Sequence, residues 1–293
     1  MNILIRHIVF LSEIFLGTLV EAQSFLNASS YQVGLGGSSL LSDLGGAKGN
    51  GSNFIKDLDL KSVRFNNSYA IDWAVTNHLE YRTAFSFNYL SADDKYSGNH
   101  DRKKRNLSVN TSIFEITPTL KYNFIGSKES ALKRWTKRST TNIYLTFGAG
   151  LIYFNPKAKF DGKQVSLHNL TTEGQGLNGG ANPYSKFSFV IPFGFGLSKE
   201  ITPLTSVFFE LISRKCFTDY LDDVSTVYYD NASLAAINGE ASAELADPNT
   251  SEFKNPQGTK RGNFKKNDSY FTFTFGYKKT LNFNLMENRP FKF

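Results

Sequence analysis

Apolar side chains recur at every second position along most of the chain, which is the period of a β-strand. The clearest segment has one aromatic face and one small or polar face, with Phe271, Phe273, Phe275 and Tyr277 opposite Thr272, Thr274, Gly276 and Lys278. We expect eight such strands, at about 31–42, 62–75, 79–91, 107–124, 141–155, 185–200, 204–221 and 269–281. One alternating segment is a weak signal, but eight in series predict an all-β, antiparallel protein.

Two architectures fit eight antiparallel strands: a soluble barrel or sandwich, and a barrel in an outer membrane. The chain has 27 Phe, 14 Tyr and 23 Gly among 293 residues, and only 20% of its residues are charged. The membrane arrangement explains this composition, because the aromatic face then meets lipid and the small, polar face fills the lumen. Eight strands leave an interior just wide enough for side chains. The sequence therefore favours an eight-stranded antiparallel transmembrane β-barrel with a packed polar lumen.

The connections between the predicted strands alternate in length, as they do in outer-membrane barrels. The short connections lie near 76–78 and 202–203, and the long ones are about 43–61, 93–106, 158–184 and 223–268. The segment 125–140 is an exception, because it is a long connection at the end of the barrel where the short ones are expected. An even strand count places both chain ends on one side, which we expect to be the periplasm.

Residues 1–22 are typical of a cleaved signal peptide. Arg6 and His7 precede an apolar stretch, 8–20, and Val-Glu-Ala ends the segment before Gln23. We therefore expect a signal peptide at 1–22 and an outer-membrane barrel domain at 23–293. No cysteine lies near position 23, so a lipid anchor is not expected.

Five charged residues fall on the predicted lumenal faces: Arg82, Glu115, Lys121, Glu210 and Arg214. Charges that are buried have to be paired. A structural ion cluster is the favoured interpretation, and transport of protons or ions is the alternative.

Four strings near the predicted loops resemble PorG and its relatives, a family of outer-membrane barrels of Bacteroidota associated with type IX secretion and gliding motility. The strings are Phe154-Asn155-Pro156-Lys157-Ala158, Thr172-Glu173-Gly174-Gln175-Gly176, Phe217-Thr218-Asp219-Tyr220-Leu221-Asp222-Asp223-Val224-Ser225 and Arg261-Gly262-Asn263. The resemblance implies a non-enzymatic subunit that contacts the periplasmic ring of the secretion machine, built from a lipoprotein and its partner. The loop 226–260 and the segment 125–140 do not match the family.

The aspartates Asp219, Asp222 and Asp223 follow the seventh predicted strand. Their carboxylates either accept backbone N–H groups and end the strand, or bind a cation such as calcium. We favour the first hypothesis, because no regular Asp-x-Asp-x-Asp-Gly loop is present.

Two basic segments suggest partners of opposite charge. The segment 125–140 contains Lys133, Arg134, Trp135, Lys137 and Arg138. It is either a solvated turn or a docking surface for an acidic periplasmic partner. The run 102–105 lies in a predicted external loop, where phosphates of lipopolysaccharide offer the counter-charge. Nucleic-acid binding does not fit an exported barrel.

The sequence does not predict an enzyme or a bound cofactor. It has no Gly-x-Ser-x-Gly motif, and its candidate pairs, Ser166 with His168 and His100 with Asp101, lie in loops. Its glycine pairs lack the full dinucleotide fingerprint, and one cysteine excludes a multi-cysteine metal site. The leading hypothesis is therefore a docking subunit of a type IX secretion system. The alternative is a surface adhesin or lipopolysaccharide-binding barrel that acts through its long loops.

Overall fold

A computed structural model describes residues 29–44, 62–76, 78–124, 141–202, 204–249, 251 and 253–281. Its strands are β1 (Ser30–Leu41), β2 (Arg64–Ala74), β3 (Leu79–Asp93), β4 (Ser108–Asn123), β5 (Thr141–Gly148), β6 (Gly150–Phe160), β7 (Lys163–Ser166), β8 (Phe187–Thr202), β9 (Thr205–Cys216) and β10 (Ser269–Thr280). The predicted signal peptide lies outside the described residues.

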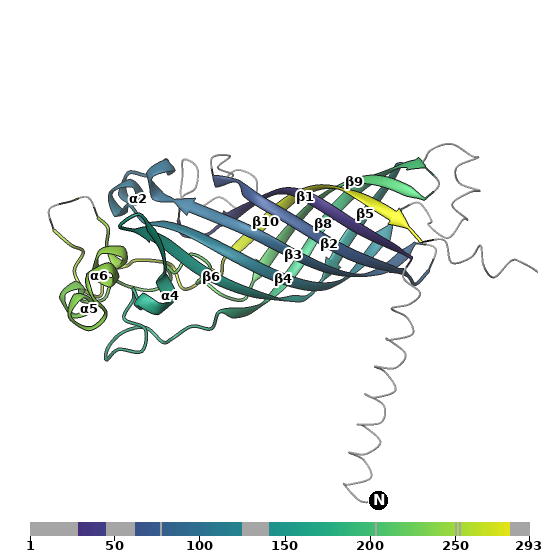
Figure 1. Ribbon diagram of the computed structural model, residues 1–293. Helices are drawn as coiled ribbons and strands as arrows, with labels where there is room; N and C mark the ends of the chain where they lie inside the picture. The colour runs from purple at the N-terminus through teal and green to yellow at the C-terminus, as the bar shows by residue number, and fades with distance from the viewer. Residues whose placement is uncertain are drawn as a thin grey trace, which may run out of the picture.

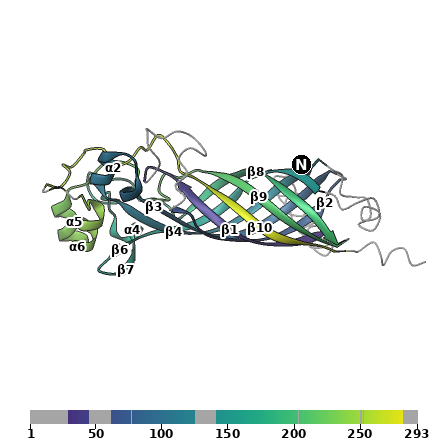
Figure 2. The same ribbon diagram turned by 90° about the horizontal axis from the view of Figure 1, so that it is seen from above.

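The strands close into a ring of antiparallel pairs (Figures 1 and 2). The first and last strands, β1 and β10, pair along their whole length, with Ser30 opposite Thr280 and Leu41 opposite Ser269. β5 and β6 form one stave of the ring, because both pair with β4 on one side and β8 on the other. With β7 outside the ring, the barrel has eight staves. The predicted eight-stranded antiparallel barrel is confirmed.

The stave made of β5 and β6 is interrupted at Ala149, next to a proline of β4. Pro118 lacks a backbone N–H and so cannot donate to the neighbouring strand. Its carbonyl still accepts from the Ala149 N–H at 3.3 Å. A Cβ added at Gly148 would lie 2.3 Å from that carbonyl oxygen, so glycine permits the close approach of the two backbones.

Side chains alternate between lumen and exterior along each stave. In β4, Glu115, Thr117, Thr119 and Lys121 are buried, whereas the neighbouring Phe114, Ile116, Leu120 and Tyr122 are exposed. The same holds across the ring, and the exposed fraction of Phe189 on β8 reaches 66%. The outer surface of the barrel is therefore a belt of aromatic and aliphatic side chains.

Among the residues that the structure describes, no helix is both long enough and apolar enough to cross a membrane.

The interior has two zones, of which the sequence analysis anticipated only the polar one. Toward the long connections, the lumen holds an apolar core that includes Leu90, Ile113, Ile152, Phe154 and Val190. Leu221 and Val224, which come from the loop after β9, pack into the same core. The loop folds back into the barrel because this removes its apolar side chains from water.

In the part of the chain that the structure describes, the helices lie in the long connections, at one end of the barrel (Figure 1). These are η3 (Asp94–Tyr96), α2 (His100–Arg105), α4 (Leu167–Leu170), α5 (Asn231–Asn238) and α6 (Glu240–Ala246). Two strand bounds differ from the prediction. β9 ends at Cys216 rather than near 221, because residues 217–225 turn into the barrel mouth. β6 continues to Phe160, because it forms a hairpin with β7.

Candidate functional site: the cap at the long-loop end

A buried ion pair closes the long-loop end of the barrel. The Arg261 guanidinium donates from Nη1 to Oε1 of Glu173 at 3.0 Å. Both residues are at most 2% exposed. Burial disfavours the arginine charge, but Glu173 and Asp223 outweigh burial, so the pKa of Arg261 lies above its usual value. Arg261 also donates to the Ala246 carbonyl oxygen from Nε at 3.1 Å, which ties α6 to the same point.

Glu173 in turn organises the loop that follows β9. Its Oε1 accepts from the Ser225 N–H at 2.9 Å, and its Oε2 accepts from the Thr226 hydroxyl at 2.6 Å. The Tyr220 hydroxyl donates to the same carboxylate at 3.4 Å. A buried carboxylate with this many donors is satisfied. We call Glu173, Tyr184, Tyr220, Asp223 and Arg261 the cap network.

Asp223 is the second carboxylate of the cap network. Its carboxylate accepts from the hydroxyl of Tyr184 at 2.6 Å and from that of Thr172. The Tyr184 ring stacks on Tyr220 with a centroid distance of 4.3 Å and an interplanar angle of 7°. Burial raises the pKa of Asp223 to about 6, although Arg261 opposes that rise. The backbone of Asp223 is left-handed, with φ of 62°, which aspartate tolerates better than most residues.

Two glycines permit close contacts in the cap. Gly174 has a φ of +68°, and a Cβ there would lie 2.4 Å from the ring of Tyr229. A Cβ on Gly262 would lie 2.7 Å from the backbone of Ser225. These glycines adjoin Glu173 and Arg261, which come from two of the four strings and are in contact although 88 positions separate them.

Asp219 and Asp222 of the predicted aspartate cluster, and Asp268 before β10, differ in their hydrogen bonds. Asp222 accepts from the Val224 N–H at 2.9 Å, a bond within the loop and six residues beyond the end of β9. The carboxylate of Asp268 accepts from the Leu221 N–H at 2.9 Å. Both oxygens of Asp219 are buried and have no hydrogen-bond partner among the described residues.

Burial also changes the acidity of these side chains. It raises the pKa of Asp219 to about 8, and the nearby Asp222 adds to this rise. It raises the pKa of Asp222 to about 7, with a further contribution from Asp43. Within the described residues, no three His, Cys, Asp or Glu side chains are grouped so that they would hold a metal ion.

The remaining residues of the family strings have local structural roles. Asn155 accepts from the Ser166 hydroxyl at 2.7 Å, which joins β6 to β7. Pro156 is buried in β6 opposite Thr111 of β4. Gln175 accepts from the Glu173 N–H at 3.0 Å, and the Gly176 N–H donates to the Ala181 carbonyl at 3.0 Å. The Thr218 hydroxyl accepts from the Tyr220 N–H at 3.2 Å.

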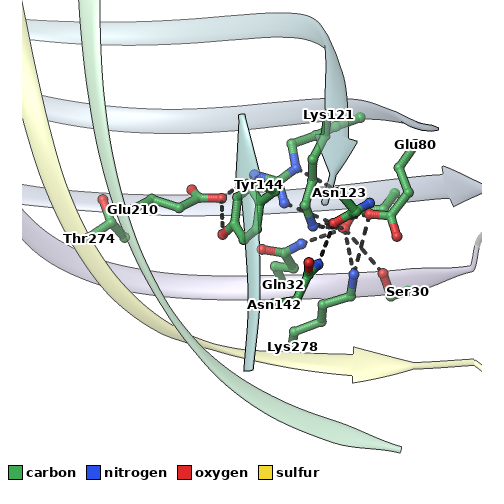
Figure 3. A network of polar contacts seen from close by, with 12 residues as sticks. Ser30, Gln32, Glu80, Lys121, Asn123, Asn142, Tyr144, Glu210, Thr274 and Lys278 are labelled. Atoms are coloured by element: carbon green, nitrogen blue, oxygen red, sulfur yellow. Dashed lines mark hydrogen bonds and ion pairs between the residues drawn. The ribbon is translucent and has the colours of Figure 1, made fainter. Parts of the chain in front are cut away.

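The five charged residues that the sequence places in the lumen are all buried, and they divide into two groups. Arg82, Lys121 and Glu210 belong to the group toward the short turns, drawn in Figure 3. Arg82 donates to Oδ1 of Asp72 at 2.7 Å and also pairs with Glu210. Figure 3 shows the Tyr144 side chain reaching Glu210, to which its hydroxyl donates at 2.7 Å.

Lys121 joins the same group through a second carboxylate. Its ammonium lies 3.1 Å from Oε2 of Glu80 and 3.6 Å from Oδ2 of Asp72. Lys278 lies 3.3 Å from the same Asp72 oxygen, and Gln32 also donates to it. The short-turn half of the lumen is thus filled by paired charges.

Glu115 and Arg214 form the other group, midway along the barrel. Arg214 Nε donates to Glu115 at 2.8 Å, and the Tyr270 hydroxyl donates to Glu115 Oε2 at 2.7 Å. The Ser86 hydroxyl also donates to Glu115 Oε2, at 3.0 Å. This group lies between the ionic zone and the apolar core.

Sequence reasoning missed several partners in these groups. Asp72 and Glu80 lie on the lumenal faces of β2 and β3, and the two-residue period alone would have identified them. Lys278 was placed on the polar face of the last strand, but its ion pairs were not predicted. Tyr184 lies in a loop, where no period identifies buried positions. The predicted docking residues Lys133, Arg134, Trp135, Lys137 and Arg138 lie outside the described residues.

Comparisons with known proteins give distant structural likeness. No protein-family model matches the chain, and no curated protein matches it. It is similar to the crystal structure of Neisserial surface protein A, at 9% identity and a TM-score of 0.39, covering 86% of this chain and 96% of that one. It is also similar to a major outer membrane protein of Thermus thermophilus, at 11% identity and a TM-score of 0.39, covering 87% of this chain and 100% of that one. The outer membrane protein OprG of Pseudomonas aeruginosa is similar at 10% identity and a TM-score of 0.37, covering 87% of this chain and 96% of that one. Function has to be argued from the side chains, because likeness at this level does not bear on it.

Proposed function

We propose that the chain is a non-catalytic outer-membrane barrel that docks a periplasmic partner, as a subunit of a type IX secretion system. The observation that carries the membrane part is the outer belt of apolar side chains around a closed ring. Phe147, Phe189 and Phe275 are each more than 60% exposed on different staves. Exposed apolar surface on this scale needs a lipid environment.

The filled interior supports a structural role rather than a conducting one. Paired charges occupy the short-turn half, and the apolar core and the cap network close the other half. An eight-stranded barrel of this kind has no open pore. The protein then acts through its two ends.

The cap network supports the secretion assignment through the family resemblance. The strings on which that resemblance rests supply Glu173, Asp223 and Arg261. The Arg261 guanidinium donates to the Glu173 carboxylate and to the backbone carbonyl oxygen of Asp223, so the three residues belong to one buried network. The strings therefore act as one structural unit, which is what a shared family architecture requires. The cap occupies the end that we place outside the cell, and in this proposal the start of β1 and the end of β10 face the periplasm.

In this proposal the segment 125–140 is the docking surface. The strands on either side of it, β4 and β5, end and begin at the end of the barrel opposite the cap. An acidic surface of the periplasmic lipoprotein ring would be attracted by the five cationic residues of this segment, Lys128, Lys133, Arg134, Lys137 and Arg138. Lipid, including lipopolysaccharide, contacts the apolar belt.

Charge reversal of this segment tests the proposal. Lys133, Arg134, Lys137 and Arg138 are changed together to Glu, cells are crosslinked, and the barrel is purified from gently solubilised outer membrane. We expect the ring lipoprotein to co-purify with the parent and not with the variant. The matched control reverses four lysines of the other end, Lys103, Lys159, Lys163 and Lys265, and should retain the lipoprotein. Retention by the 125–140 variant would contradict the docking assignment.

A further inference from the structure

A polar pocket of about 490 Å³ opens among the long loops, separate from the lumen. A volume of this size is within the range of small-ligand sites, roughly 300–1,000 Å³. Four segments that are distant in sequence form its walls: the end of β1, α2, the loop after β9 and the approach to β10. Its lining is Asp43, Asp101, Arg102, Lys104, Arg105, Tyr228, Asn249, Asn255, Lys260, Arg261, Gly262 and Asn263.

The floor of the pocket is held in place by Arg105. Its guanidinium pairs with Asp94 at 2.7 Å and donates to the carbonyl oxygens of Arg261 at 2.8 Å and Asp43 at 2.9 Å. The Asp43 carboxylate accepts from the Asn263 N–H. One side chain thus joins three of the four walls, and a floor fixed in this way lowers the ordering entropy that a ligand has to overcome.

The rim of the pocket carries an excess of positive charge. Its lining includes five cationic residues and two acidic ones. Lys104 and Lys260 are exposed and form no ion pair with another described residue. They come from two different segments of the lining, α2 and the loop between β9 and β10. Lysine and arginine are the side chains that recognise phosphate and carboxylate.

Neutral hydrogen-bonding groups occupy the rest of the lining. Tyr228 is only 4% exposed and lines the pocket, to which it adds a hydroxyl group. Asn249, Asn255 and Asn263 add amide groups that can donate and accept. Asn255 Nδ2 already donates to Asp247 Oδ1 at 2.8 Å, and Asn249 Oδ1 accepts from the Ser251 hydroxyl at 2.8 Å. The Tyr228 hydroxyl and the Asn263 amide are therefore the neutral groups that sugar hydroxyls would engage and a bare inorganic anion would not.

We propose that this pocket binds an anionic saccharide, with its phosphate or carboxylate between Lys104 and Lys260 and its hydroxyls against Tyr228 and Asn263. This site goes beyond the proposed function, because it lies at the opposite end of the barrel from segment 125–140. Failure of one assignment leaves the other in place.

Calorimetric titration of the full-length mature barrel in a non-ionic detergent tests the site. The probes are glucose 6-phosphate, glucose and inorganic phosphate. We expect saturable binding of glucose 6-phosphate, with each of the other two weaker by roughly ten-fold, since each lacks one class of contact. Equal affinity for phosphate alone would overturn the saccharide assignment, and so would no saturable binding of glucose 6-phosphate.

Matched charge reversals separate the pocket from general surface charge. The Lys104→Glu/Lys260→Glu double variant should lose binding of glucose 6-phosphate by roughly ten-fold or more. The Lys159→Glu/Lys163→Glu double variant makes the same charge change on the β6–β7 hairpin, where both lysines are exposed, and should bind as the parent does. Equal losses in the two variants would overturn the site.

The Tyr228→Phe variant tests the neutral contacts, because it removes one hydroxyl and keeps the buried ring. It should weaken glucose 6-phosphate more than inorganic phosphate, and an equal effect on both would contradict the proposed pose. Competition by phosphorylated lipopolysaccharide, lost after dephosphorylation, would identify a lipid-linked source of the saccharide. Binding of the free sugar phosphate without such competition would identify a soluble source.

Discussion

Arg261 and Glu173 lie 88 positions apart in the sequence and form a buried ion pair of 3.0 Å at the mouth of the barrel. The pair joins the loop before β8 to the loop before β10, and the loop after β9 is bonded to the same carboxylate. A single contact therefore holds the β7–β8 connection against both ends of the β9–β10 connection. This relationship makes the cap a cooperative unit that can be tested apart from the barrel.

Removing the arginine should open the cap and leave the barrel intact. Arg261→Met leaves the Glu173 charge buried without its partner, a change that typically costs about 3–5 kcal/mol. Hydrogen exchange in residues 217–226 should speed up accordingly, while exchange in β1 to β4 stays at the parent level. Lys95→Met is the control. Its ion pair with Asp93 is surface-exposed, and such pairs contribute at most about 1 kcal/mol. Equal protection in the parent and Arg261→Met would show that the pair does not hold the cap.

Gly174 and Gly179 provide a matched comparison of packing. Both have positive φ, +68° and +77°, so alanine strains the backbone at either position. A Cβ at 174 also meets the ring of Tyr229, whose hydroxyl is anchored on the Asn178 carbonyl at 3.0 Å, whereas a Cβ at 179 meets nothing within 4 Å. Gly174→Ala should destabilise the cap by about 1 kcal/mol or more beyond Gly179→Ala, because overpacking forces side chains to move. Proteolysis of the long loops measures the difference, and equal rates of cleavage would contradict the packing account.

Stability of the cap should fall as pH rises from about 4 to about 8. Burial raises the pKa values of Asp219 and Asp222 from 3.8 to about 8 and about 7. Between those limits the folded cap binds more protons than the open one, and stability then decreases with pH. The free energy of opening, obtained from hydrogen exchange corrected for intrinsic rate at each pH, measures this slope.

Amide variants identify the groups responsible for that slope. Asp219→Asn and Asp222→Asn remove the ionisable group and keep its shape, so each should flatten the pH dependence. Asp161→Asn removes a charge from the exposed β6–β7 turn and should leave the slope unchanged. A parent cap that gains stability toward pH 8 would contradict this assignment of the acidic cluster.

The lumen pair of Glu115 and Arg214 should show strong coupling. Arg214→Met leaves Glu115 buried with its charge and should cost about 3–5 kcal/mol in urea unfolding from detergent micelles. Glu115→Gln added to that variant removes the stranded charge and keeps an acceptor for Tyr270 and Ser86. The double variant should therefore be more stable than Arg214→Met alone. Additive losses would show that the two side chains do not act as a pair.

The sequence predicts the staves well because the two-residue period is a local property. In β4, the inward Glu115 and Lys121 and the outward Phe114 and Leu120 are all evident from alternation alone. The apolar core was not predicted, because nothing local shows that Leu221 and Val224 fold back into the barrel.

The cap was predicted less completely for the same reason. The family strings identified Glu173, Asp223 and Arg261 as residues of interest, but not that they touch. Their contact depends on the long-range folding of two loops, the β7–β8 and β9–β10 connections. Tyr184, which also belongs to the cap network, lies outside any recognised string. The pocket with the cationic lining was not predicted for the same reason, because its walls come from four separate segments.

Labelling from outside the cell tests the central claim, that this barrel spans the outer membrane with its cap outward. Single cysteines are introduced by Lys163→Cys at the cap end and by His78→Cys at the short-turn end, and the native Cys216 is buried. A membrane-impermeant maleimide should label the Lys163→Cys variant in intact cells. It should label the His78→Cys variant only after the outer membrane is permeabilised. Labelling of His78→Cys in intact cells, or protection of Lys163→Cys, would contradict the orientation and with it the docking of a periplasmic partner through segment 125–140.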